Sequence, residues 1–172
     1  MKITGDIYIR TAQVCSAIIL ILSTLAMIGW LMDIRSLASL VPGYIPIAPV
    51  AALAFILLGS AWYLYARAPS RWFTRIYVLI SVFSISLIAL LNLIQFTTGA
   101  KVGFEEYLVR EILGIDPGAY GAGPMSPITA ASFILICTAV VLLLFAPGRH
   151  AAGLSSDLAS VVVSAGLLVL MG

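Results

Sequence analysis

Charged side chains are scarce in this sequence. Asp, Glu, Lys and Arg make up only 9% of its 172 residues, whereas hydrophobic residues make up 62%. About a quarter of the residues of a soluble domain are charged, so this composition excludes an ordinary soluble protein. The charges also cluster, and they leave long intervals without any: Thr11–Met32, Ser36–Ala66, Ile76–Ala100 and Pro117–Gly148. Each interval can hold a membrane-spanning helix of about 20 residues, which predicts an all-α integral membrane protein.

Residues that hold metals and cofactors are equally rare. The chain has one histidine, His150, and two cysteines, Cys15 and Cys137, which both fall in apolar intervals. A single histidine excludes a His-rich metal site or a bis-histidine haem within one chain, and we interpret the two thiols as small hydrophobic side chains. The sequence also lacks a Gly-rich phosphate loop and a Ser/His/Asp set. We therefore expect no cofactor and no catalytic activity, and the net charge of +2 gives no reason to expect nucleic acid as a partner.

What the sequence does contain is a repeat. The segment Ile45–Ala61 recurs as Gly123–Ala139, with identical residues at many aligned positions. The identical pairs are Pro46/Pro124, Pro49/Pro127, Ala52/Ala130, Phe55/Phe133, Ile56/Ile134, Leu57/Leu135 and Ala61/Ala139. Proline is favoured in the first turn of a helix, so each copy predicts a helix that begins at its second proline. Ser126, just before Pro127, predicts an N-cap, whereas Ala48 at the matching position predicts a weaker helix start.

The apolar intervals and the repeat together predict about five membrane spans. We place the first four at 11–32, 49–66, 76–96 and 127–145, and a fifth from about residue 151 to the last residue. The spans form a single membrane domain, 1–172, built from tandem helix-loop-helix repeats. The first repeat covers about 11–66, the second about 76–146, and an incomplete third about 151–172. Because the third repeat lacks its second helix, we expect the natural chain to continue past Gly172.

The longest polar stretch, 97–125, contains a different kind of helix. Within 101–115, apolar residues recur at helical spacing, and charged residues lie mostly off that stripe. The apolar residues are Phe104, Leu108, Ile112 and Ile115, and the charged ones are Glu105, Glu106, Arg110 and Glu111. This pattern is typical of an amphipathic helix on a membrane surface or against a helix bundle. The adjacent Glu105 and Glu106 would point to different sides of that helix, which argues against a catalytic carboxylate pair.

The distribution of Lys and Arg predicts the orientation of the chain, because cytoplasmic loops carry an excess of these residues. The N-terminus and the second and fourth turns carry Lys2, Arg10, Arg67, Arg71, Arg75 and Arg149. The first and third loops carry only Arg35, Lys101 and Arg110. We therefore expect a cytoplasmic N-terminus, with the 101–115 helix on the outer side.

Polar residues inside the spans are the remaining candidates for function, because hydrocarbon makes them costly. Asn92 and Gln95 lie three residues apart and share a face near the outer end of the third span. They are expected either to form interhelical hydrogen bonds or to contribute to an outer ligand pocket. The predicted outer sensing surface comprises Asn92, Gln95, Phe104, Tyr107, Leu108, Arg110 and Glu111. In the fifth span, Ser156, Ser160 and Ser164 recur every fourth residue and predict close helix packing.

The proline motif resembles a known membrane region. The pattern Pro-x-x-Pro-x-Thr-Ala-x-x-Phe-x-Leu occurs at Pro124–Leu135, with Thr129 in place, and at Pro46–Leu57, with Ala51 instead of the threonine. It is similar to the multi-pass N-terminal region of bacterial sensor histidine kinases and of related PAS- or GGDEF-containing signalling proteins. The resemblance implies a signal-input module in the bacterial inner membrane. Its partners would be the lipid bilayer and a cytoplasmic transmitter domain or further copies of the chain, and the resemblance identifies no ligand.

This chain has no PAS domain, no phosphoacceptor histidine box and no ATP-binding region, so it would phosphorylate nothing by itself. A second function stays open, that of a small structural or accessory subunit of a larger membrane complex, with the serine-striped helix as a docking face. A transporter needs polar sites at the membrane midplane and broken helices. The spans carry no charged residue at their centres, so transport ranks last.

Overall fold

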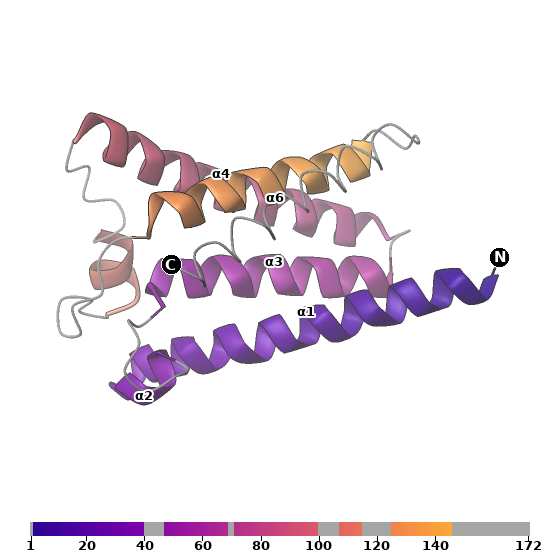
Figure 1. Cartoon of the computed structure of the whole chain (residues 1–172), viewed down its shortest axis with the longest axis horizontal. Helices are drawn as coiled ribbons and strands as arrows, with labels where there is room; N and C mark the ends of the chain where they lie inside the picture. Colours follow the sequence, from indigo (N-terminus) through magenta and orange to yellow (C-terminus); the bar gives the residue numbers. More distant parts are fainter. Residues whose placement is uncertain (1, 40–46, 69–70, 100–106, 115–124, 146–172) are drawn as a thin grey trace. The chain divides into compact units, whose positions relative to one another are not determined.

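The computed structural model describes residues 2–39, 47–68, 71–99, 107–114 and 125–145, and these residues form helices and short turns without any strand. The helices are α1 (Lys2–Leu31), α2 (Arg35–Ala38), α3 (Pro49–Arg67), α4 (Trp72–Thr98), the π-helix η1 (Leu108–Ile112) and α6 (Pro127–Phe145) (Figure 1). The expectation of an all-α chain is confirmed for this part of the sequence.

Four of these helices are long and apolar enough to cross a membrane. The candidate spans are Arg10–Leu31, Pro49–Arg67, Trp72–Thr98 and Pro127–Phe145. They match the first four spans expected from the sequence, as in a multi-pass membrane protein. The expected fifth span and third repeat, 151–172, lie outside the described residues, as do the serines at 156, 160 and 164.

Two helices extend further than the apolar intervals indicate. Helix α1 begins at Lys2, so the polar lead is helical and continuous with the first span. Helix α4 begins at Trp72 instead of residue 76 and ends just before Gly99, whose φ of 66° is typical of the residue that terminates a helix. Hydropathy locates the apolar centre of a helix, whereas local features such as Gly99 mark its ends.

The chain divides into two compact units. The first contains α1, α2, α3, η1 and the beginning of α4 up to Ser81, and the second contains the remainder of α4 together with α6.

In the first unit, α1 and α3 lie side by side and run in opposite directions (Figure 1). Helix α1 turns one face inward, and its buried residues are Ser16, Ser23, Ala26, Met27 and Trp30. Helix α3 buries mostly small residues, namely Ala51, Ala52, Ala54, Gly59 and Ala61. Small side chains allow close approach of helices in a membrane. Gly59 lies where an added Cβ would come within 3.1 Å of the Leu20 side chain.

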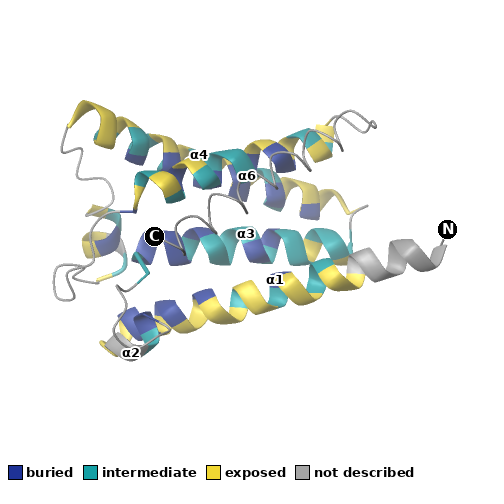
Figure 2. Ribbon diagram, in the orientation of Figure 1, coloured by how far each residue is buried: buried dark blue, intermediate teal, exposed yellow. Residues whose placement is uncertain are grey.

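The exposed faces of the helices are apolar. On α1 the exposed large hydrophobic residues include Val14, Ile18, Ile21, Leu25, Ile28 and Leu31, and on α4 they include Ile76, Ile80, Phe83, Leu87, Leu90 and Ile94. Figure 2 shows exposed residues along both helices. Such continuous apolar surface is rare on soluble monomers. Hydrocarbon, in contrast, needs no polar covering, so lipid is the solvent that these faces fit.

In the second unit, α6 is apolar on all sides and buries only a narrow stripe. Ala130, Phe133, Cys137 and Val140 are buried and recur at helical spacing. The Cys137 side chain lies near the side chain of Ser86 on α4. Cys137 therefore packs in the interior as a small side chain, as expected from the sequence.

Candidate functional site

The connection between α1 and α3 is tied to both helices at one end of the hairpin. The indole N–H of Trp30 donates a hydrogen bond of 2.8 Å to the carbonyl oxygen of Ile47, just before α3. The backbone N–H of Ile47 in turn donates to the carbonyl oxygen of Ala38, at 3.1 Å. Trp30 and Ala38 are buried. This end of the hairpin, which we call the loop end, is thus closed by hydrogen bonds from the last turn of α1 to the start of α3.

A tight reversal brings α2 back onto the last turn of α1. Asp33 has a φ of 61°, and the backbone N–H of Ile34 donates to the carbonyl oxygen of Gly29 at 2.8 Å. Aspartate is one of the few residues besides glycine that adopt this conformation readily. A Cβ added at Gly29 would lie 2.4 Å from the backbone nitrogen of Ala38 and 2.8 Å from the carbonyl carbon of Leu37. The two backbones therefore meet at a point where only glycine fits.

The third loop contains a π-helix, η1, in the same compact unit. The backbone N–H of Leu113 donates to the carbonyl oxygen of Leu108 at 3.2 Å, the five-residue spacing of a π-turn. Gly114, with a φ of 67°, follows at the C-terminus. The buried residue is Val109, which is 2% exposed, whereas Leu108 is half-buried. The apolar stripe predicted through Leu108 rests on a 3.6-residue period, and a π-turn rotates residues relative to that period, so that Val109, which is not on the stripe, is buried.

Of the other members of that stripe, Phe104 and Ile115 lie outside the described residues, and for Ile112 the backbone alone is described.

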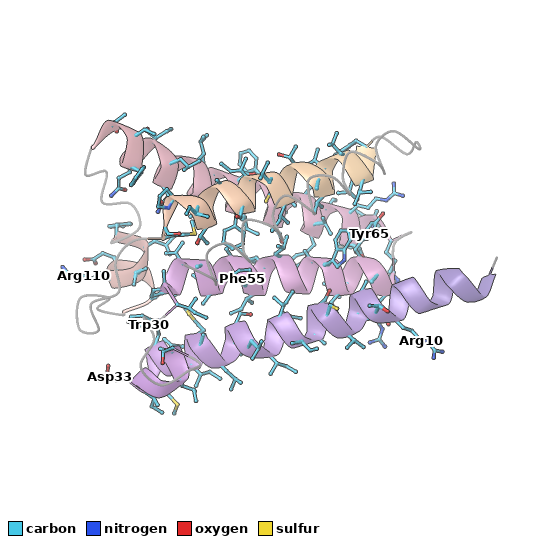
Figure 3. All side chains as sticks on the ribbon, in the orientation of Figure 1. Arg10, Trp30, Asp33, Phe55, Tyr65 and Arg110 are labelled. Carbon is cyan, nitrogen blue, oxygen red and sulfur yellow. The ribbon has the colours of Figure 1, made fainter. Side chains whose placement is uncertain are left out.

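Three residues of the predicted sensing surface are exposed on or beside η1. Tyr107 is 61% exposed, and Arg110 and Glu111 are also exposed. Figure 3 shows Arg110 at the same end of the first unit as Trp30 and Asp33, opposite to Arg10 and Tyr65. The structure thus brings part of the predicted surface to the loop end of the hairpin.

Asn92 and Gln95 do not belong to that group. Both lie on α4 within the second compact unit, whereas η1 belongs to the first. Asn92 is buried and has an interaction partner, and Gln95 is half-buried. The choice between interhelical hydrogen bonding and an outer ligand pocket stays a prediction for this pair.

The two copies of the proline motif begin their helices in the same way. Pro49 and Pro127 each occupy the first position of a helix, and the carbonyl oxygens of Ala48 and Ser126 accept bonds of 3.0 Å from the backbone N–H groups of Ala52 and Ala130. The Ser126 hydroxyl also accepts a 3.2 Å bond from the backbone N–H of Thr129. It further pairs with the Thr129 hydroxyl at 2.8 Å.

Ala48 gives α3 no side-chain cap. The predicted side-chain cap at Ser126 is confirmed, and the weaker start of the first copy stays a prediction. Of the two motif phenylalanines, Phe133 is buried and Phe55 half-buried. Pro46 and Pro124 lie outside the described residues.

Three contacts were not predicted from the sequence. They are the Trp30–Ile47 hydrogen bond, the backbone approach at Gly29, and a 2.7 Å hydrogen bond between the hydroxyl groups of Ser60 on α3 and Tyr77 on α4. A tryptophan at the end of a span is typical of a membrane interface, but the hydrogen-bond partner of Trp30 is 17 residues away in the chain. A tryptophan at the end of a helix, followed by a polar turn, indicates that the indole N–H will find a hydrogen-bond acceptor. The sequence does not identify which carbonyl group is the acceptor.

Among the described residues, no three His, Cys, Asp or Glu side chains come together in a group that could hold a metal ion. Comparison of the chain with protein-family models, with curated proteins and with solved structures finds no match.

Proposed function

We propose that this chain is a non-catalytic, membrane-embedded signal-input module. The observation that carries the proposal is the hydrogen-bonded loop end, where Trp30, Ala38 and Ile47 join the end of α1, helix α2 and the start of α3. A loop attached in this way cannot move without displacing the helix ends. A stimulus at the loop would therefore change the arrangement of α1 and α3 along their length.

The exposed residues around η1 supply a receiving surface. Tyr107, Arg110 and Glu111 offer an aromatic ring, a cation and a carboxylate, while the buried Val109 anchors the segment to the first unit. A stimulus acts by binding one arrangement more tightly than the other. A tenfold shift in population needs a difference of about 1.4 kcal/mol, comparable to one net hydrogen bond of about 0.5–1.5 kcal/mol.

The experiment measures whether the loop end controls the opposite end of the hairpin. Spin labels are placed at Val14→Cys and Leu64→Cys, both exposed sites, in a Cys15→Ala background, and the full chain is reconstituted in lipid nanodiscs. The distance distribution is then compared between the parent and Val109→Asn, which buries an amide in an apolar site and releases η1. Trp30→Phe, which removes the bond to Ile47, is the second perturbation.

We expect both changes to shift or broaden the distribution, while Phe83→Leu, a substitution on the lipid-exposed face of α4, leaves it unchanged. Identical distributions for all variants would contradict the signal-input function. If that result came with stoichiometric membrane companions after purification in mild detergent, the accessory-subunit function would be favoured instead.

A further inference from the structure

The end of the first unit opposite to the loop end carries a cluster of arginines. Arg67 closes the last turn of α3, Arg71 immediately precedes α4 and Arg75 lies in its first turn. Arg10 on α1 lies at this end as well, as Figure 3 shows. All four arginine side chains are exposed, and no ion pair is formed by any of them among the described residues.

Acidic side chains do not offset this charge in the described part of the unit. The two whose side chains are described, Asp33 and Glu111, are at the other end, on the turn after α1 and on η1. Asp6 lies one helical turn before Arg10 on α1 and is the nearest acid in sequence, and it is far from α4 along the chain. The three arginines between residues 67 and 75 therefore present their positive charges at the surface of this end of the unit.

Exposed aromatic rings accompany the arginines. Trp72 and Phe73 open α4 with 62% and 67% of their surface exposed, and their ring centroids are 3.8 Å apart. Trp62 and Tyr65 stack at 5.7 Å in the last turns of α3. Tryptophan and tyrosine concentrate at membrane–water interfaces, where the ring lies at the level of the lipid head groups. Rings at that level would bring the neighbouring arginines to the depth of the lipid phosphates.

We infer that this end, comprising Arg10, Arg67, Arg71, Arg75, Trp72 and Phe73, is a binding site for the phosphate head groups of anionic phospholipids. Guanidinium groups form paired hydrogen bonds to phosphate oxygens, and each basic residue near an anionic surface adds to the attraction. A free phosphate ion would gain nothing from Trp72 and Phe73, whereas a lipid extends from the phosphate into the apolar surface beside them. The inference is independent of the proposed signal-input function.

The test is competition between lipids for the full chain. The purified protein is incubated with an equimolar mixture of phosphatidylglycerol and phosphatidylcholine, and bound lipids are counted by native mass spectrometry. We expect a preference for phosphatidylglycerol that falls by more than tenfold in the Arg67→Gln/Arg71→Gln/Arg75→Gln variant. Each single substitution should lower the preference by about fivefold.

Arg110→Gln is the matched control, because it removes the same charge from the opposite end of the same unit. The preference should be unchanged in this variant and should resist 10 mM inorganic phosphate. The proposal is overturned if the triple variant keeps the preference, if Arg110→Gln loses as much, or if free phosphate displaces the lipid. If the triple variant does not fold, the single variants decide, and an unchanged preference in all three overturns it. The proposal would also be overturned if the chain bound an acidic protein at this end and showed no preference for phosphatidylglycerol over phosphatidylcholine.

Discussion

At the scale of single residues, Gly29 and Gly59 are both buried in helices of the α1–α3 hairpin but meet different surroundings. Gly29 faces backbone atoms of α2, which cannot move without opening the turn at Asp33, whereas Gly59 faces only side-chain atoms, the Cγ and Cδ2 of Leu20 and a methyl group of Ile19. The same chemical change, one added methyl group, therefore tests two kinds of packing.

We predict that Gly29→Ala destabilises the protein by about 1–3 kcal/mol, the usual cost of forcing extra volume into a packed site. Gly59→Ala should be within about 1 kcal/mol of the parent, because Leu20 can adjust and alanine favours the helix. Unfolding in a detergent titration measures both. An equal loss of stability in the two variants would show that the backbones of α1 and α2 are not as close at Gly29 as described.

At the scale of secondary-structure elements, the two proline-initiated helices differ mainly in their caps. Ala48 has a φ of −54° and a ψ of 134°, an extended conformation suited to an N-cap, but it has no side chain to bind the free N–H groups. The second copy has that side chain in Ser126. The two sites are thus natural controls for each other.

Ser126→Ala should cost about 1 kcal/mol of stability, and Ala48→Ser should add up to a similar amount. Thermal unfolding monitored by circular dichroism in the same detergent checks both changes. Loss of stability in Ala48→Ser would mean that the start of α3 cannot accommodate a capping serine.

The hydrogen bond between Ser60 and Tyr77 links α3 to the beginning of α4. A double-mutant cycle with Ser60→Ala and Tyr77→Phe should give a coupling energy of about 0.5–1.5 kcal/mol, because each single change removes the same bond. Additive effects would indicate that the hydroxyl groups do not pair in the membrane. Ser86→Ala, on the same helix in the second unit, serves as a control that should not couple to Ser60.

These elements also show what could be read from the sequence and what could not. The spans were predictable because a helix in hydrocarbon must be apolar over its whole length, and the starts at Pro49 and Pro127 because proline and serine act locally. The burial of Val109 could not be predicted, because one π-turn changes which residues of a short helix face inward. The loop end was missed because Trp30 and Gly29 depend on partners brought close by the turn at Asp33.

At the scale of the whole molecule, the arginine distribution predicts the orientation in the membrane. A cysteine at position 71 should react with a membrane-impermeant maleimide only after permeabilisation of the cells, because positive loops stay in the cytoplasm. A cysteine at position 111 should react in intact cells. The opposite labelling pattern would contradict the predicted orientation and would mean that η1 lies in the cytoplasm. Cys15 is replaced by alanine in both variants to remove background reaction.

The turn at Asp33 has a consequence for biosynthesis. The backbone hydrogen bonds of the loop end and the bond from Trp30 to Ile47 join residues between 28 and 47, so these particular bonds can form before later parts of the chain are made. Contacts between residues near in sequence form quickly, and chains begin to fold from the N-terminus as they are made. We expect α1 and α3 to leave the translocon as a paired unit while the ribosome is still adding α4.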